Sequence, residues 1–211
     1  MNKTFLWVIG VVVVIIILML LGRGGPDIEP PFELGVLHPL DNIKGNASST
    51  IVFMEYSDFQ CPACRAYYPI MRELMTEFGD RVLFVFRHFP LTGIHPNAEF
   101  AARAAEAAGR QGKFWEMHDL LFEKQNEWAG VAEILPTFES YALLLGIDIQ
   151  KFKEDFTAED VKNFVRAERL HAVTSGLQGT PSFFINGEQI QNPSSAEEFR
   201  LIILKKLELQ P

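Results

Sequence analysis

The sequence contains two cysteines, and both lie in one tetrapeptide, Cys61-Pro62-Ala63-Cys64. A disulfide between them closes a very short loop, so it removes little entropy from the unfolded chain and stabilises the fold only modestly. Secreted domains that depend on disulfides for stability usually carry four or more cysteines at longer spacings. The pair is therefore better suited to exchanging electrons than to stabilising the chain.

The order of residues in the tetrapeptide predicts unequal roles for the two thiols. Pro62 suits the first turn of a helix, which places Cys61 at the helix amino terminus. The unpaired amides and the helix dipole favour negative charge there, so we expect a lowered pKa for the Cys61 thiol. Cys61 is then the exposed nucleophile that forms a mixed disulfide, and Cys64, further inside the helix, resolves it.

A Cys-x-x-Cys pair also occurs as half of a zinc site, but a structural zinc ion normally takes four ligands. The sequence has no second pair of this kind, and His88, His95, His118 and His171 form no ligand-spaced pair. We therefore predict neither a metal nor a cofactor within one chain. A copper-binding or dimer-bridging role for the lone cysteine pair stays open.

Glu55 is the third candidate for chemistry. It lies within Ile51–Tyr56, a short apolar run that is typical of a strand buried on both faces. Burial of a carboxyl group raises its pKa, and Glu55 lies close enough in sequence to exchange a proton with Cys64. The alternative is a glutamate at a strand edge that reaches solvent; we favour the functional role because charged residues are rarely buried without a partner.

Local patterns along the rest of the chain predict an α/β fold. The expected order is a strand over Ile51–Tyr56, a helix from Pro62 to about Phe78, a strand over Arg81–Arg87, a helical block over about 97–176 that Pro136 interrupts, a hairpin of Ser182–Ile185 and Glu188–Ile190, and a final helix over Ser195–Leu207. Asn186-Gly187 is a strong signal for the hairpin turn. The first three elements form a βαβ unit, which places the cysteines where a strand is followed by a helix.

The amino terminus predicts a membrane anchor. The run from Phe5 to Leu21 has no charged or strongly polar side chain, and it reaches the short end of the roughly 17–25 residues that cross a bilayer as a helix. Gly22-Arg23-Gly24 matches a signal-peptidase site poorly, so we favour an uncleaved anchor. Lys3 favours a cytoplasmic amino terminus and an extracytoplasmic domain. The predicted organisation is a transmembrane anchor within 1–25, a tether over 26–35 and a domain over 36–208.

Composition supports a globular domain that does not bind nucleic acid. Of the 211 residues, 48% are hydrophobic and 22% are charged, which suits a single folded domain with a terminal extension. The formal net charge is −8, and the first 25 residues carry only basic charges, so the domain itself is more acidic still. An acidic domain without a basic cluster repels polyphosphate, which argues against a nucleic-acid partner.

Four stretches resemble DsbA-like members of the thioredoxin superfamily. They are Glu55-Tyr-Ser-Asp-Phe-Gln-Cys61-Pro-Ala-Cys64, Arg87-His-Phe-Pro-Leu91, Lys113-Phe-Trp-Glu-Met-His-Asp-Leu-Leu121 and Gly179-Thr-Pro-Ser-Phe-Phe-Ile-Asn-Gly187. Their order and spacing match that family over about residues 36–208. Together these stretches are far more specific than the cysteine pair alone.

The resemblance implies a thioredoxin-like fold in which 97–176 is a helical insertion. It also implies a cis bond between Thr180 and Pro181 beside the first cysteine, although local sequence alone leaves cis and trans open. Residue 180 would offer backbone hydrogen bonds to an extended substrate, and proline at 181 would keep an amide away from the sulfurs. Glu55 matches the buried acidic position of the family, and His88 is expected to be structural.

By this resemblance, the protein is expected to be an oxidase that passes its Cys61–Cys64 disulfide to newly exported proteins and is recharged by a membrane redox partner. A reductase or isomerase is the first alternative, although residues 26–50 are too few for the dimerisation domain that isomerases usually carry. A tethered metal-binding or holdase protein is the second. The Pro62-Ala63 dipeptide matches neither strongly oxidising nor reducing relatives, so the direction of electron flow stays open. Phe59 and Gln60 either shape a substrate groove or pack inside.

Overall fold

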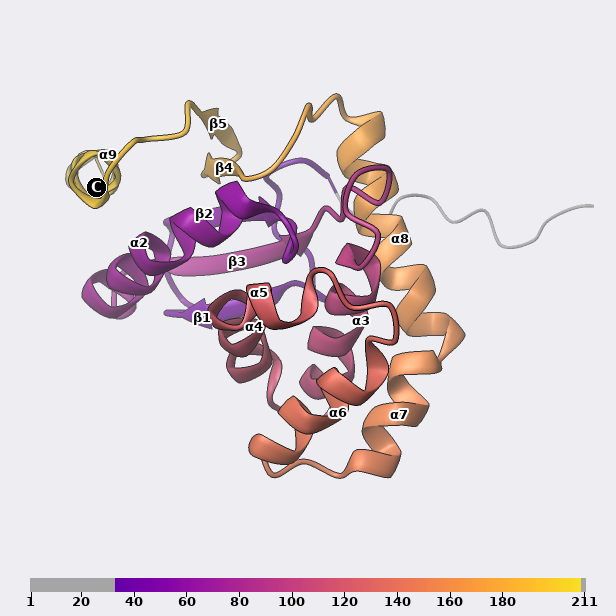
Figure 1. Cartoon of the computed structure of the whole chain (residues 1–211). Coiled ribbons are helices and arrows are strands. Elements are labelled where there is room, and N and C mark those ends of the chain that lie inside the picture. Colours follow the sequence, from indigo (N-terminus) through magenta and orange to yellow (C-terminus); the bar gives the residue numbers. More distant parts are fainter. Residues whose placement is uncertain (1–32, 210–211) are drawn as a thin grey trace, which may run out of the picture.

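A computed structural model describes residues 33–209, in which five strands form one mixed sheet (Figure 1). The strands are β1 (Asn42–Gly45), β2 (Val52–Ser57), β3 (Leu83–His88), β4 (Ser182–Ile185) and β5 (Glu188–Ile190). Their order across the sheet is β1-β3-β2-β4-β5, and only β2 and β3 pair in parallel. Every residue of β3, and all of β2 after its first residue, is buried, as expected for strands covered on both faces.

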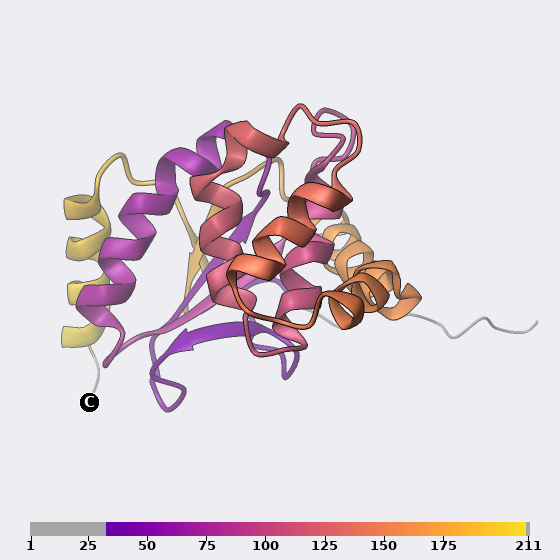
Figure 2. The same cartoon turned by 60° about the horizontal axis from the view of Figure 1, so that its bottom comes forward.

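The helices fall into two groups by their place in the chain. They are α2 (Pro62–Phe78), α3 (Ala98–Gly109), α4 (Phe114–Glu123), α5 (Gln125–Trp128), α6 (Leu135–Leu144), α7 (Ile149–Thr157), α8 (Glu159–Thr174) and α9 (Ala196–Glu208). Helices α2 and α9 flank the strands in the chain, and α3 to α8 form one inserted block. In Figure 2, α9, α2 and α4 lie side by side, and contacts join α2 to both neighbours. Helices α3 to α8 all lie between β3 and β4 in the chain and form the inserted helical part.

The alternation of side chains along β2 decides what lies under the cysteine helix. Phe53 packs with residues of α2 and α9, and its ring centroid lies 5.8 Å from that of Phe199. Met54 belongs to a separate cluster on the opposite face, with residues of α8. Because successive side chains of a strand point to opposite faces, Glu55 and Ser57 share the face of Phe53 and point toward α2.

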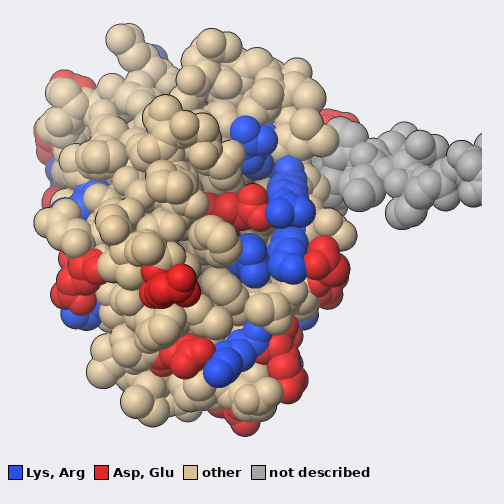
Figure 3. Space-filling model, turned by 45° about the vertical axis from the view of Figure 1, so that its right-hand side comes forward, with Lys and Arg blue, Asp and Glu red and all other residues tan. Residues whose placement is uncertain are grey.

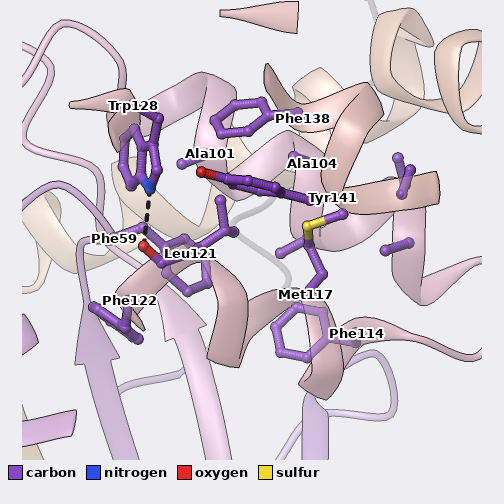
Figure 4. Packing of buried hydrophobic residues seen from close by; sticks show 14 of the residues in the cluster. Phe59, Ala101, Ala104, Phe114, Met117, Leu121, Phe122, Trp128, Phe138 and Tyr141 are labelled. Carbon is purple, nitrogen blue, oxygen red and sulfur yellow. Dashed lines mark hydrogen bonds between the residues drawn. The ribbon is translucent and has the colours of Figure 1, made fainter. Parts of the chain in front are cut away.

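The inserted helices have a dense core of their own (Figure 4). Small side chains on α3, among them Ala101 and Ala104, allow the neighbouring helices to approach closely. Trp128 is fully buried, and its indole nitrogen donates a 2.8 Å hydrogen bond to the carbonyl of Leu121. Phe59, from the loop before Cys61, packs into the same core. The loop that leads to the cysteines is therefore held by the insertion.

A buried ion pair attaches the first described residues to the sheet. Arg87 on β3 and Asp41 have no exposed side-chain surface, and the Arg87 Nε lies 2.7 Å from Asp41 Oδ1. Arg87 also donates to the Tyr56 hydroxyl at 2.8 Å and to the Glu33 carbonyl at 2.8 Å. A buried charge is tolerated when it is paired and hydrogen-bonded in this way. The network explains why β1 can add to β3 although three of its four residues are exposed.

Most predicted elements agree with the structure, with two corrections. The helix Pro62–Phe78 and the hairpin strands Ser182–Ile185 and Glu188–Ile190 have the predicted bounds. Strand β1 was not predicted, because its sequence Asn-Ile-Lys-Gly has no apolar alternation. The expectation that Pro136 interrupts a helix is wrong: it lies in the first turn of α6, where its missing N–H is no loss.

The predicted membrane span over Phe5–Leu21 lies outside the described residues, as does most of the predicted tether over 26–35. Between residues 33 and 209, the structure contains no helix that is both long and apolar enough to cross a bilayer. The helices α3 to α8, from Ala98 to Thr174, lie inside the predicted insertion of 97–176.

Candidate active site

The two cysteines lie in the first turn of α2 and differ in exposure. Cys61 is the residue that caps the helix, with extended backbone angles, and Pro62 occupies the first helical position. Cys61 is 7% exposed and Cys64 is 0% exposed, and the two thiols are not joined in this structure. The sequence predicted an exposed Cys61, whereas the structure buries most of it. Cys61 is still the more accessible of the two sulfurs, so a reagent that arrives from solvent meets it first.

The surroundings of the two sulfurs have opposite effects on their pKa values. A hydrogen bond from the Cys64 thiol is the main cause that lowers the pKa of Cys61 to about 5. Burial works against this shift, whereas the amides of Cys64 and Ala63 and the nearby Thr180 side chain support it. Burial raises the pKa of Cys64 well above its ordinary value, and the interaction with Cys61 and the charge of Glu55 raise it further. The thiolate therefore forms on Cys61 and the proton stays on Cys64.

Thr180 forms one wall beside Cys61. The Thr180–Pro181 peptide bond is cis, as the family resemblance implied. The Cys61 thiol donates to the carbonyl of Thr180, with a distance of 3.6 Å between sulfur and oxygen. The Asn192 side chain donates to the carbonyl of Pro181 at 2.7 Å and so holds this loop from the other side. Pro181 itself has no N–H to compete for the sulfur.

A groove begins near this loop but does not include the cysteines. Its volume is about 720 Å³, and its lining residues lie on β5, the following loop and α9: Ile190, Gln191, Asn192, Pro193, Ser194, Glu198, Leu201 and Ile202. Asn192 belongs to this lining and also contacts Pro181. The lining is mainly apolar, which suits the side chains of an extended peptide.

Glu55 lies beneath the motif, where the sequence placed it. It is 5% exposed, and burial raises its pKa to about 7, although the nearby Ser57 hydroxyl opposes the rise. Its charge contributes to the raised pKa of Cys64, so the two groups interact. A carboxyl group with a pKa near neutrality is well matched to transferring a proton at neutral pH.

The loop before Cys61 is fixed by hydrogen bonds that sequence reasoning did not find. The side-chain amide of Gln125 on α5 donates to the carbonyls of Phe59 at 2.7 Å and Cys61 at 3.0 Å. Gln60 accepts from the Asn97 amide at 2.7 Å. Phe59 and Gln60 are 1% and 9% exposed, so both pack inside. These partners are far apart in sequence, and no local pattern indicates them.

Asp58 fixes the same loop to the segment after β3. Its carboxylate accepts from the amides of Gln60 at 2.7 Å and Leu91 at 2.8 Å, and it lies 2.7 Å from the Nδ1 of His95. The Asp58 side chain is fully buried, so these contacts replace the water that it loses. Asp58 is therefore a structural partner of the cysteine loop that the sequence did not single out.

His88 has the structural role that the sequence gave it. Its ring is 1% exposed, and its Nε2 lies 2.8 Å from the Glu106 carboxylate. The backbone amide of His88 donates to Glu168 at 2.8 Å. Burial and the charge of Glu106 raise the pKa of Glu168 well above its ordinary value. Within residues 33–209, no group of three or more His, Cys, Asp or Glu side chains is arranged to hold a metal ion.

One face of the molecule carries a band of basic side chains with acidic ones among them (Figure 3). This face includes α8, on which Arg166 pairs with Glu99 at 3.0 Å and Lys162 pairs with Glu159 at 2.6 Å. Basic and acidic groups here neutralise each other at short range. The face therefore presents mixed charge, not a field of one sign.

A nucleophilic thiol at a helix amino terminus, a buried partner thiol and a neighbouring cis-proline loop define a thioredoxin-type dithiol site. A family model described as thioredoxin matches residues 39–205. The chain therefore belongs to the thioredoxin family.

Known proteins are similar to this chain at two levels. This chain is 44% identical to the Na(+)/H(+) antiporter NhaA 1 of Salinispora arenicola over 151 residues. The aligned region covers 71% of this chain and 22% of that protein. The chain spans between 22% and 28% of the length of such curated relatives.

Among solved structures, BdbD from Bacillus subtilis has a TM-score of 0.71 at 24% identity and covers 80% of this chain and 93% of that one. Wolbachia pipientis alpha-DsbA1 has a TM-score of 0.70 at 19% identity, with coverage of 83% and 97%. At this level of identity the structural likeness shows the fold.

Proposed function

We propose that this protein catalyses thiol–disulfide exchange and acts as a dithiol oxidase on newly exported, cysteine-containing proteins. The observation that carries this proposal is the position of Cys61 at the amino terminus of α2 with Cys64 buried one turn inside, an arrangement that lowers the pKa of Cys61 to about 5. A stabilised thiolate stabilises the reduced protein, which makes its disulfide a stronger oxidant. Nucleophilic thiols in Cys-x-x-Cys sites have pKa values from about 7 in reducing thioredoxin to about 3.5 in the strong oxidase DsbA, and Cys61 lies between them.

In the oxidase direction, a substrate thiolate attacks the Cys61 sulfur of the Cys61–Cys64 disulfide. The bond between the two cysteines breaks, and Cys64 leaves as a thiolate that takes a proton from Glu55. A second substrate thiolate then attacks the substrate sulfur of the mixed disulfide. This step forms the substrate disulfide and releases Cys61 as a thiolate, so two electrons stay on the protein.

The neighbouring loop positions the substrate in this scheme. The Thr180 carbonyl lies beside Cys61 and can accept a hydrogen bond from an extended substrate segment, as in strand addition. Pro181 donates no hydrogen bond of its own, so the sulfurs keep their partners. The apolar groove that continues through Asn192 would take side chains of the same segment.

We further propose that the protein works at the outer face of the cell membrane, anchored by residues 5–21. The support is the apolar run from Phe5 to Leu21 and the single Lys3 before it. Relatives named as antiporters contain a matching region within a much longer chain, which is consistent with a dithiol domain attached to a membrane protein. A membrane redox partner would take the two electrons and restore the disulfide.

The second candidate is a disulfide reductase, because the Pro62-Ala63 dipeptide is that of neither strongly oxidising nor reducing relatives. The experiment that separates the two is a titration of the Cys61–Cys64 couple against glutathione. We expect a reduction potential above about −200 mV, within the range of oxidising members of the superfamily. A value near −250 mV or lower would contradict the oxidase and support the reductase. Bound copper or zinc without exchange activity would point to a metal-binding role instead.

A further inference from the structure

The Ser57 hydroxyl is a buried polar group close to the reacting thiols. Ser57 is the last residue of β2 and is 1% exposed. In the part of the chain that the structure describes, its oxygen has no hydrogen-bond partner of good geometry. Buried side-chain hydroxyls are normally hydrogen-bonded, because burial without a partner costs the hydration of the group and returns nothing. A buried Ser57 hydroxyl therefore does not stabilise the fold, which points to a role of this group in the chemistry of the site.

Ser57 lies between the two buried groups of the candidate site. It follows Glu55 by two residues on the same strand, so both side chains leave the sheet on the face covered by α2. Cys64 is in the first turn of α2 and fully buried. Burial raises the pKa of both Glu55 and Cys64, and the nearby Ser57 hydroxyl opposes that rise at each of them. The hydroxyl therefore lies on the buried side of β2 that faces α2, the side on which the carboxyl group and the thiol also lie.

A hydroxyl group is suited to joining these two groups. It can donate one hydrogen bond and accept another at the same time, whereas a carboxylate only accepts. Among residues 33–209, no direct hydrogen bond connects Glu55 with Cys64, which interact through charge. Proton transfer needs a hydrogen-bonded path, directly or through one intervening group. A rotation of the Ser57 hydroxyl would supply that path.

We propose that Ser57 relays the proton between Glu55 and Cys64 during thiol–disulfide exchange. When the mixed disulfide is resolved, the Cys64 thiol gives its proton to the Ser57 oxygen as the Ser57 proton moves to the Glu55 carboxylate. The Cys64 thiolate attacks the Cys61 sulfur and forms the Cys61–Cys64 disulfide, and the substrate leaves as a thiolate. In the oxidase direction the same path returns the proton from Glu55 to Cys64. This proposal rests on the proposed exchange function.

The test separates the two steps of exchange with an aromatic disulfide whose thiol is coloured. The reduced protein releases one coloured thiol when Cys61 attacks and a second when Cys64 resolves the mixed disulfide. We expect Ser57→Ala to slow the second release at least about tenfold at pH 7, because general acid–base assistance is worth more than that in full. The first release should keep its rate, since it depends on the Cys61 thiolate.

Two comparisons make the result decisive. Ser57→Thr keeps a hydroxyl and should restore most of the second release. In the background of Glu55→Gln, Ser57→Ala should add no further slowing, because both substitutions interrupt the same path. The second comparison does not depend on how Ser57→Thr folds.

An unchanged second release in Ser57→Ala would overturn the relay. So would equal slowing of both releases, or effects of Ser57→Ala and Glu55→Gln that multiply. A wild-type protein that releases no coloured thiol would overturn the exchange function and the relay together. A wild-type protein with both releases and an unaffected Ser57→Ala variant would overturn the relay alone.

Discussion

The surroundings of Cys61 and Cys64 differ more than their separation by two residues suggests. Cys61 lies at the open end of α2, where backbone amides and Thr180 favour its thiolate. Cys64 lies one turn inside, fully buried, with the charge of Glu55 beside it. One environment stabilises negative charge and the other resists it. The same pair of side chains thus provides one thiolate and one proton reservoir.

Part of the difference comes from segments outside the tetrapeptide. Thr180 is 119 residues from Cys61, and Glu55 belongs to the strand that precedes the motif. The tetrapeptide supplies the helix start, the two sulfurs and the hydrogen bond from Cys64 to Cys61, and the strand with Glu55 and the loop with Thr180 add to the contrast between the two thiols. Substitutions near Cys61 should therefore affect the attack on the substrate, and substitutions near Cys64 should affect the resolution of the mixed disulfide.

The largest expected effect is the loss of either sulfur. Cys61→Ser should abolish exchange with a model disulfide, because Cys64 is 0% exposed and cannot meet the substrate first. Cys64→Ser should keep the first step and accumulate a mixed disulfide at Cys61, since the resolving thiol is missing. Mass spectrometry of the intact protein distinguishes the two results. Rapid exchange by Cys61→Ser would show that the roles are assigned the wrong way round.

The sequence predicted the local parts of this site well. Pro62 predicted the helix start, the spacing predicted the pair, and the apolar run around Glu55 predicted a buried carboxyl group. These features depend on helix geometry and strand burial, which a few neighbouring residues decide. The hairpin strand Ser182–Ile185 was predictable for the same reason, because Asn186-Gly187 marks its turn.

The features that the sequence did not predict depend on tertiary contacts. Strand β1 is mostly exposed and has little strand pattern, and it forms through pairing with β3 next to the buried Arg87–Asp41 ion pair. Gln125 holds carbonyls 64 and 66 residues away, and nothing in its own segment indicates this role. Ser57 lies one residue beyond the predicted strand Ile51–Tyr56, and only its burial without a well-placed partner draws attention to it.

The next largest effect should come from Glu55→Gln. The change keeps the shape and removes the proton acceptor, so resolution by Cys64 should slow about tenfold to a hundredfold at pH 7. The Cys61 attack should be nearly unchanged. Stopped-flow measurement of both steps tests this, with Glu106→Gln as a control for removing a carboxylate from the insertion. Equal slowing of both steps would contradict a role specific to Cys64.

The same substitution should change the dependence of stability on pH. The pKa of Glu55 is about 7 in the folded protein and 4.5 without the surrounding structure. Below pH 4.5 both states are protonated and the wild-type residue carries no penalty. As pH rises from 4.5 through 7 the unfolded state is increasingly favoured, so Glu55→Gln should be more stable above pH 7 by up to roughly 3 kcal/mol. Urea unfolding at pH 4 and pH 8 measures the difference.

Another prediction concerns the pKa of Cys61. Because a hydrogen bond from Cys64 is the main cause of the low value, Cys64→Ala should raise the pKa of Cys61 above about 5. Cys64→Ser keeps a donor and should raise it less. The rate of alkylation of the remaining thiol against pH gives both values, and below its pKa the rate should fall about tenfold per pH unit. Identical profiles for the two variants would show that the amides alone set the pKa.

The lowered pKa of Cys61 also links the stability of the dithiol form to pH. The pKa is about 5 in the folded protein and 9.0 in the absence of the fold. A depressed pKa contributes stability that is complete above pH 9 and is lost as pH falls toward 5. The reduced protein should therefore lose stability on acidification over this range, whereas the disulfide form, which has no thiol to titrate, should lose less. Urea unfolding of both forms across this pH range measures the two slopes.

The smallest expected effect tests whether the inserted helices hold the loop that positions Cys61. Gln125→Leu keeps the approximate volume but removes the two hydrogen bonds to the carbonyls of Phe59 and Cys61. The Cys61 carbonyl keeps the Arg65 amide as a partner, whereas the Phe59 carbonyl loses the partner that Gln125 gave it. One buried carbonyl without a partner costs about 1–3 kcal/mol, so the protein should be destabilised by a similar amount. The loop should also hold Cys61 less firmly, and its attack rate should fall a few-fold while the resolution by Cys64 changes less.

Gln111→Leu is the matched control for this substitution. Gln111 also makes two hydrogen bonds through its side chain, to the backbone of Asp148, but it lies at an exposed site of the insertion. Its loss should lower stability less, because water can replace the missing partners, and it should leave both steps of exchange unchanged. If Gln111→Leu slows the attack of Cys61 as much as Gln125→Leu, the insertion affects the site only through its overall stability.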